Sequence, residues 1–141
     1  MMSVRNLFLL TISALFIIGF SSCGSKSVRK DGTPKRASIQ LDSTTAQLGT
    51  FPRSASMRTT VFTFTNVGDA PLEFLDMSVS CNCISAVYPD KPVKPGKKGE
   101  IVVTYKGNNK NPGKFQYRVY FAVTGSPRTF FLRVKGDMTE N

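Results

Sequence analysis

After residue 36, apolar side chains alternate with polar ones in short runs, and glycine, proline and asparagine separate these runs. Successive side chains of a β-strand point to opposite faces, so this alternation is typical of strands with one buried face. The clearest run is 115–123, where phenylalanine, tyrosine and valine occupy every second position. No stretch of this region shows the spacing of an amphipathic helix, and an all-β fold is therefore predicted.

Seven strands are expected from these runs. They cover residues 39–41, 47–50, 59–65, 72–79, 100–105, 115–123 and 129–135. Turns rich in glycine and proline separate them, for example at 66–71, where Gly68 is expected to take a positive φ. About seven strands in roughly 100 residues is the size and spacing of an antiparallel immunoglobulin-like β-sandwich. That architecture is the predicted fold class.

The alternation slips by one residue within 72–79. Leu72 and Phe74 have one parity, whereas the other parity belongs to Leu75, Met77 and Val79. A β-bulge inserts one extra residue into a strand and so reverses the faces beyond it. A bulge near 74–76 is predicted, which would let both sets of side chains reach the core.

The first stretch, 1–22, has the pattern of a bacterial lipoprotein signal peptide. Arg5 precedes an apolar run at 7–20, which is shorter than a transmembrane helix of about 20 residues but fits a secretory signal. Small residues then lead to Cys23 in a sequence that resembles a lipobox, although Phe20 stands where leucine, valine or isoleucine is usual. Cys23 is the expected lipidation site and mature N-terminus. Cleavage at an ordinary secretory site would instead leave its thiol free.

Residues 23–37 are polar and basic and show no hydrophobic periodicity. A segment of this composition cannot bury enough apolar surface to fold, so it is expected to be a flexible tether. The folded domain is expected at 38–141. A lipidated Cys23 would also explain why the number of cysteines in the chain, 3, is odd.

The formal net charge of the chain is +10. An exported protein rarely meets nucleic acid, and the lysine-rich turns at 89–99 and 106–113 lack the interleaved aromatic residues of a single-stranded nucleic-acid groove. No nucleic-acid partner is expected. The charge fits either attraction to anionic envelope polymers and lipid head groups or a solvated surface without a specific partner.

Five motifs then follow in order across 39–138. They are FTNVGDAPLEF, SCNC, KPVKPGKKGEIVVTY, NPGKFQYRVYF and FLRVKGDM. Their order resembles a bacterial domain family of unknown function. Its members are small immunoglobulin-like domains, common in envelope lipoproteins of Gram-negative bacteria and similar in shape to major-sperm-protein and cilia-associated immunoglobulin-like domains. The resemblance implies the fold and implies no activity, because the family has no agreed biochemistry.

Two positions depart from the family pattern. Asn82 stands where the family usually has glycine between the two cysteines. Asparagine is one of the few other residues that enter left-handed backbone conformations readily, so a positive φ is predicted at position 82. In 121–125 the chain lacks the polar Ser-Asn that follows this strand in the family, which implies a reshaped hairpin.

Cys81 and Cys83 are two residues apart, so in a strand they would share a face. Their Cα atoms would lie about 6.6 Å apart in a straight strand, near the upper limit for a disulfide. A kink at Asn82 would shorten this distance, and exported proteins meet conditions in which disulfides form. Such a bond closes a very small loop, gains little chain entropy and would be easily reduced. A reduced, buried pair is the alternative.

A metal site is a further possibility for this pair. Two thiolates with the thioether of Met77, which has the same parity, are soft ligands suited to Cu(I). Zinc would need carboxylates, because the chain has no histidine and no acidic residue adjoins the pair. A catalytic dithiol is not favoured, since two residues usually separate its cysteines within a βαβ unit.

The sequence lacks other catalytic constellations. Without histidine there is no Ser-His or Cys-His pair, and no glycine-rich phosphate loop precedes a helix. We therefore expect no enzyme and no small-molecule substrate. The expected function is that of a lipid-anchored cell-envelope protein, in the outer membrane, whose domain binds envelope protein partners, for example by pairing along a sheet edge. The alternative is a Cu(I)-binding or thiol-redox protein that works through Cys81 and Cys83.

Overall fold

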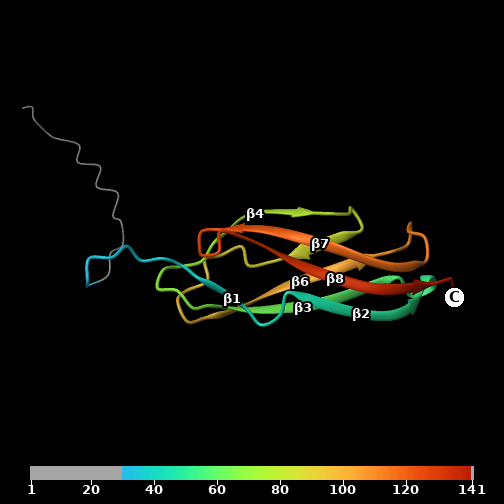
Figure 1. Cartoon of the computed structure of the whole chain (residues 1–141), viewed down its shortest axis with the longest axis horizontal. Helices are drawn as coiled ribbons and strands as arrows, with labels where there is room; N and C mark the ends of the chain where they lie inside the picture. Colours follow the sequence, from blue (N-terminus) through green and yellow to red (C-terminus); the bar gives the residue numbers. More distant parts are fainter. Residues whose placement is uncertain (1–29, 141) are drawn as a thin grey trace, which may run out of the picture.

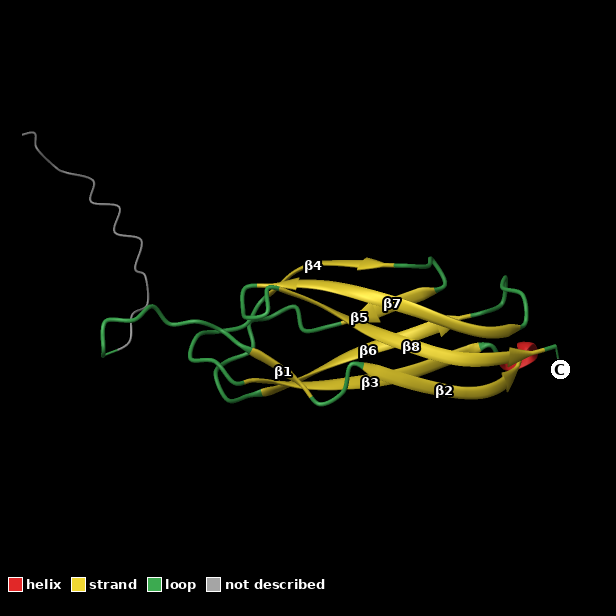
Figure 2. Ribbon diagram, in the orientation of Figure 1, coloured by secondary structure: helices red, strands yellow, loops and turns green. Residues whose placement is uncertain are grey.

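The computed structural model describes residues 30–140, which form two β-sheets packed face to face (Figures 1 and 2). The predicted signal peptide and Cys23 lie outside the described residues. The elements are β1 (Ile39–Leu41), β2 (Thr45–Pro52), the short 3-10 helix η2 (Arg53–Ala55), β3 (Met57–Asn66), β4 (Phe74–Val79), β5 (Ile84–Val87), β6 (Lys98–Lys106), β7 (Gly113–Val123) and β8 (Thr129–Thr139). Within this part of the chain, no helix has the length and apolar character of a membrane span.

The predicted sandwich is confirmed, with eight strands rather than seven. The additional strand is β5, which follows Cys83 directly and has only four residues. Its alternation is too short to stand out from the neighbouring loop, and its pairing with β6 is what makes it a strand. One sheet has the order β1-β3-β6-β5 and the other β2-β8-β7-β4. Neighbouring strands are antiparallel except β2 and β8, which run parallel.

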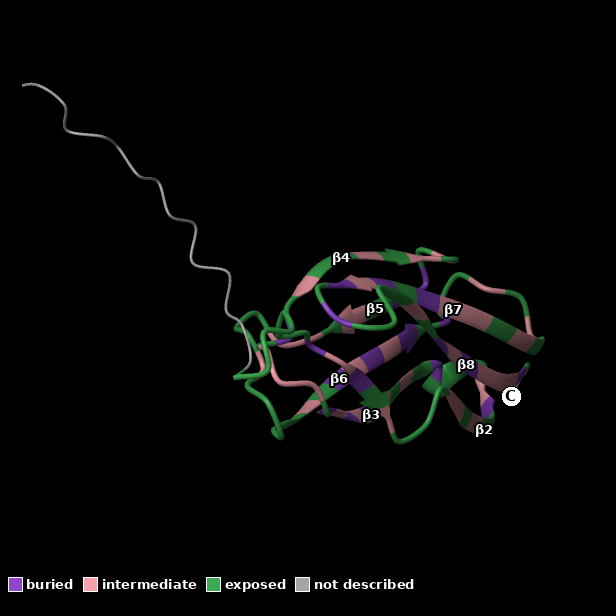
Figure 3. Cartoon of the chain, turned by 60° about the vertical axis from the view of Figure 1, so that its left-hand side comes forward, coloured by how far each residue is buried: buried purple, intermediate pink, exposed green. Residues whose placement is uncertain are grey.

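The core lies between the sheets, and buried positions alternate with exposed ones along the strands (Figure 3). It contains most of the side chains that the alternation predicted to face inward, together with Phe51, Ile84 and Met138, which the alternation did not predict. The most deeply buried core side chains are Phe51, Phe64, Tyr105, Phe121, Leu72, Ile101, Leu132, Met138, Val103, Val119, Val123 and Val134. Each such side chain contributes about 1.5–3 kcal/mol when it leaves water. Aromatic rings join the two sheets, because Phe74 of β4 meets Phe64 and Phe121 edge to face, with ring centroids 5.6 Å and 5.7 Å away.

The predicted bulge in β4 is also confirmed. The register of β4 against β7 shifts between Phe74 and Asp76. The bulge turns Phe74 and Met77 towards the core. It does not do so for Leu75, which is 59% exposed. The expectation that Leu75 reaches the core is therefore wrong, because the bulge reverses the faces on either side of this residue and leaves its own side chain in solvent.

Asn66, at the end of β3, is completely buried and fully hydrogen bonded. Its Nδ2 donates to the carbonyl oxygens of Ala70 and Val93, each at 2.8 Å. Its Oδ1 accepts from the backbone N–H of Gly68 at 3.1 Å and of Ser38 at 3.3 Å. One side chain thus fastens β3 to the segment that leads into β1, to its own following turn and to the loop before β6.

Gly68 has a different role from the one expected. It is not among the glycines with positive φ. A Cβ at this position would instead overlap the carbonyl oxygen of Arg36 and the backbone nitrogen of Ser38. Glycine is needed here because the incoming chain passes directly against the turn.

Asn66→Asp tests the importance of these bonds. The substitution keeps the shape but replaces two N–H donors with an acceptor that faces the carbonyl oxygens of Ala70 and Val93. We expect the free energy of unfolding to fall by at least about 3 kcal/mol, since buried groups lose their partners. Urea unfolding measures the change, and Asn109→Asp on an exposed turn is the matched control. Equal stability of the two variants would contradict the assigned role.

Candidate functional site

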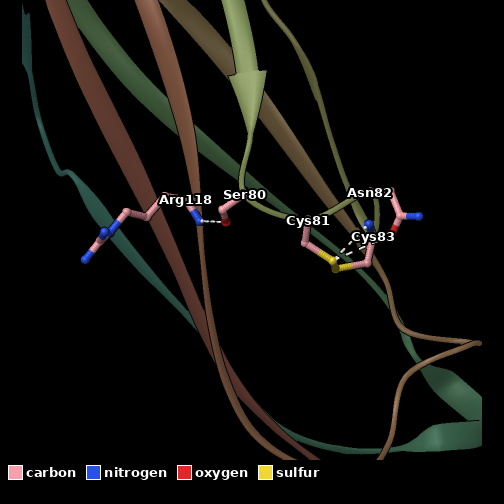
Figure 4. The surroundings of a disulfide bond; sticks show 5 residues. All are labelled: Ser80, Cys81, Asn82, Cys83 and Arg118. Atoms are coloured by element: carbon pink, nitrogen blue, oxygen red, sulfur yellow. Dashed lines mark hydrogen bonds between the residues drawn. A yellow bond between two sulfur atoms is a disulfide. The ribbon is translucent and has the colours of Figure 1, made fainter.

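The two neighbouring cysteines lie in the turn that joins β4 to β5 (Figure 4). Because β4 is an edge of one sheet and β5 an edge of the other, this turn crosses between the sheets at one side of the sandwich. In the structure a disulfide joins Cys81 and Cys83, whose Cα atoms are 5.1 Å apart. That separation is shorter than in a straight strand and falls within the range that a disulfide requires.

Backbone hydrogen bonds close the turn around the disulfide. The N–H of Ile84 donates to the carbonyl oxygen of Cys81 at 3.1 Å, and the N–H of Lys106 donates to that of Cys83 at 2.8 Å. No residue other than glycine has a positive φ between residues 30 and 140. The left-handed conformation predicted for Asn82 is therefore wrong, because a turn closed between the first and fourth residues can form without a left-handed residue.

The turn is also fastened to β7, the neighbour of β4 in the same sheet. Ser80 donates its N–H to the carbonyl oxygen of Arg118 at 3.0 Å and accepts the N–H of Arg118 through Oγ at 2.8 Å. Cys83 is buried, at 5% exposure, whereas Cys81 is only half-buried. The position of the disulfide is thus fixed by β7 on one side and by β6 on the other.

The structure places the third predicted metal ligand, Met77, on β4 opposite Phe121 and against the core. In the disulfide state neither cysteine sulfur is a thiolate, so binding of Cu(I) would require the reduced pair. Among residues 30–140 no three side chains of histidine, cysteine, aspartate or glutamate gather at one point. The Cu(I) site stays a prediction.

Tyr105 is a titratable group in the core, where it stacks on Phe115 with ring centroids 4.3 Å apart. Burial raises the pKa of its phenol above the usual value, and the neighbouring Tyr117 adds to this rise. Both effects disfavour the phenolate. The side chain is therefore neutral at physiological pH and contributes packing.

A second candidate site lies on the outer face of the sheet β2-β8-β7-β4. Tyr120 of β7 and Phe131 of β8 lie directly opposite each other, with ring centroids 5.9 Å apart. They remain 40% and 39% exposed. Together with Asp76, Ser78, Ala122 and Thr129 they line an open groove of about 610 Å³.

Sequence reasoning did not identify this aromatic pair, although a signal was present. Within β7 and β8, Tyr120 and Phe131 occupy the parity whose other members are mainly polar or small. Large aromatic residues at solvent-facing positions on two strands indicate a surface feature once the strands are known to be neighbours. The register that brings these two side chains together is not visible in the sequence.

The outer face of the other sheet has a different character. Val61, Val102 and Val87 form a row across β3, β6 and β5. Val61 is 51% exposed and Val87 is 70% exposed. This row ends at the edge strand β5 and includes no aromatic residue, so it provides a comparison surface for the aromatic groove.

A family model matches residues 39–138, which is most of the chain. The chain therefore belongs to this family, which is described as a protein of unknown function (DUF1573). The match covers the same residues as the resemblance found in the sequence. No curated protein sequence matches the chain.

Solved structures show the same fold at low sequence identity. A protein of unknown function from Porphyromonas gingivalis W83 has a TM-score of 0.63 and 15% identity over 72% of this chain and 46% of that chain. A PapD-like (ASH) domain of human CEP192 has a TM-score of 0.60 and 9% identity over 84% of this chain and 96% of that chain. The VesB protease of Vibrio cholerae has a TM-score of 0.57 and 17% identity, but only 31% of that chain is covered. The likeness establishes an immunoglobulin-like fold and transfers no activity.

Mass spectrometry with a thiol-alkylating reagent tests the cysteine pair. Without reductant, Cys81 and Cys83 are expected to stay unmodified, and after reduction both should be alkylated. Because the closed loop is very small, reduction should lower the free energy of unfolding by no more than about 2 kcal/mol. Alkylation of both cysteines without reductant would contradict the disulfide and leave two thiols available for Cu(I).

Proposed function

We propose that this protein is a lipid-anchored component of the bacterial cell envelope whose immunoglobulin-like domain binds a protein partner, without catalysis. The observation that carries the proposal is the exposed pair Tyr120 and Phe131 above the groove between β4, β7 and β8. The family membership and the immunoglobulin-like fold support a binding or structural role in general.

An exposed aromatic pair favours a protein interface over a solvated surface. Single exposed apolar residues are normal on proteins, but tyrosine and phenylalanine are enriched at the centres of protein interfaces. Tyr120 and Phe131 also stand beside a groove that a partner side chain can fill. Interface positions of this kind contribute most of the binding energy in characterised complexes.

The position of the groove is compatible with an anchor at the N-terminus. The described chain enters the sandwich at the end where β1 begins, and both sheets extend away from that end (Figure 1). The groove lies on the side of the sandwich, on the outer face of one sheet. A tether that ends where the chain enters the sandwich would therefore leave this face accessible to proteins in the envelope.

Site-specific photo-cross-linking in cells tests the interface. Tyr120→p-benzoylphenylalanine is expected to form a defined adduct with one envelope protein, because position 120 would lie within the interface. The matched control is Val61→p-benzoylphenylalanine, because Val61 is exposed on the outer face of the other sheet. The affinity for the identified partner should fall by about tenfold or more in Tyr120→Ala, as for other interface anchors.

The absence of any adduct at position 120, or the same adducts from position 61, would contradict a binding role of this face. An adduct from position 120 that Tyr120→Ala does not weaken would also count against it.

Cys23→Ala tests the anchor. The wild-type protein is expected to carry an acyl mass at Cys23 and to sediment with membranes, because two or more acyl chains hold a protein stably on a bilayer. The variant should lose the acyl mass and leave the membrane fraction, while its domain stays folded by circular dichroism. An unacylated wild-type Cys23 would contradict the proposed anchor.

A further inference from the structure

Two arginines gather beside the exposed aromatic pair. Arg118 of β7 and Arg133 of β8 lie directly opposite each other on the same outer face. The guanidinium carbon of each lies 5.4 Å from the centroid of the Phe131 ring. Both positive charges therefore converge on one aromatic side chain, in a geometry that permits cation–π attraction.

The charges of this pair are not compensated within the domain. Across residues 30–140 the structure shows no ion pair for either guanidinium, and the Nε atoms of Arg118 and Arg133 are buried without a hydrogen-bond partner. Like charges directly opposite each other on neighbouring strands are unfavourable. An arginine has five N–H donors, so the pair offers several donors to an external acceptor.

The surroundings make this part of the face positive. Lys135 follows Arg133 at the same parity on β8, and Lys114 lies further along β7 opposite Asp137. Asp76 lies at the other end, where it lines the aromatic groove. The charge that would complement the middle of the face is negative.

We propose that Arg118 and Arg133 form a carboxylate-binding centre, and that the partner presents an acidic protein segment to it beside Tyr120 and Phe131. This inference rests on the proposed function of the same face. The planar guanidinium matches a carboxylate with two parallel hydrogen bonds. Tyrosine, phenylalanine and arginine are all enriched at protein interfaces.

An acidic protein segment fits the geometry better than an anionic glycan does. The planes of Tyr120 and Phe131 are inclined by 52° to each other. The two rings therefore do not form one flat platform on which consecutive sugar rings could stack. The inclined rings form an uneven surface that side chains of a protein segment can fill.

The test measures binding of a fluorescent decaglutamate peptide to the full chain in detergent by anisotropy. The Arg118→Gln/Arg133→Gln variant should bind at least about tenfold more weakly than wild type, because two charge-assisted contacts are lost. Lys98→Gln/Lys106→Gln removes the same charge from exposed positions of β6 on the other sheet and is the matched control. The control should bind within about twofold of wild type, since distant exposed charges are screened by salt.

A second variant separates the effect of the positive charge from that of the guanidinium geometry. It also tests the proposal if Arg118→Gln/Arg133→Gln does not fold. Arg118→Lys/Arg133→Lys keeps both charges but loses the planar fork of donors. We expect it to bind decaglutamate about threefold or more weakly than wild type. Wild-type affinity in this variant would overturn bidentate recognition.

Several results would overturn the carboxylate centre. The first is that decaglutamate does not bind. The second is that the control Lys98→Gln/Lys106→Gln weakens binding as much as Arg118→Gln/Arg133→Gln does. The third is that a heparin decasaccharide binds in an arginine-dependent manner and the peptide does not. The proposed function is contradicted by a different result, namely that position 120 forms no cross-linked adduct in cells. An adduct at position 120 that persists in the arginine variant would overturn the carboxylate centre alone.

Discussion

The buried amide of Asn66 is the interaction on which one end of the sandwich depends. Its four side-chain hydrogen bonds join β3 to the segment before β1, to the following turn and to the loop before β6. A buried amide is stabilising only when all of its groups are paired, so these segments are held in one arrangement. This is also the end at which the chain enters the domain (Figure 1). The incoming chain at residues 36–38 is therefore held in one arrangement against this end of the sandwich.

The cysteine turn and the proposed binding face are parts of one connected region. Ser80, which precedes Cys81, holds the backbone of Arg118 through two hydrogen bonds. The disulfide therefore lies next to the residue that is hydrogen bonded to the strand segment of Arg118 (Figure 4). A structural role of the disulfide as support for the binding face requires neither metal nor redox chemistry.

Features that depend on residues close together in the chain were predicted correctly from the sequence. Features that depend on contacts between residues far apart in the chain were not. The alternation in 115–123 and the slip of parity near Phe74 predicted β7 and the bulge of β4 correctly. The strand β5 was not predicted, because its existence depends on pairing with β6. The role of Gly68 depends on the distant Arg36 and Ser38, and the exposure of Leu75 depends on the register with β7. The aromatic pair was not recognised because it forms only when β7 and β8 lie side by side.

The positions of the charges are more informative than the net charge of +10. Lysines in turns are strongly hydrated and contribute little beyond solubility and a general attraction to anions. Arginine is more weakly hydrated and stacks on aromatic rings, so Arg118 and Arg133 can remain beside Phe131 with their Nε atoms buried. Placing two such charges side by side costs stability in the free domain. Local features of this kind are found mainly at functional sites, and a bound carboxylate would turn the repulsion between the two arginines into attraction for a partner.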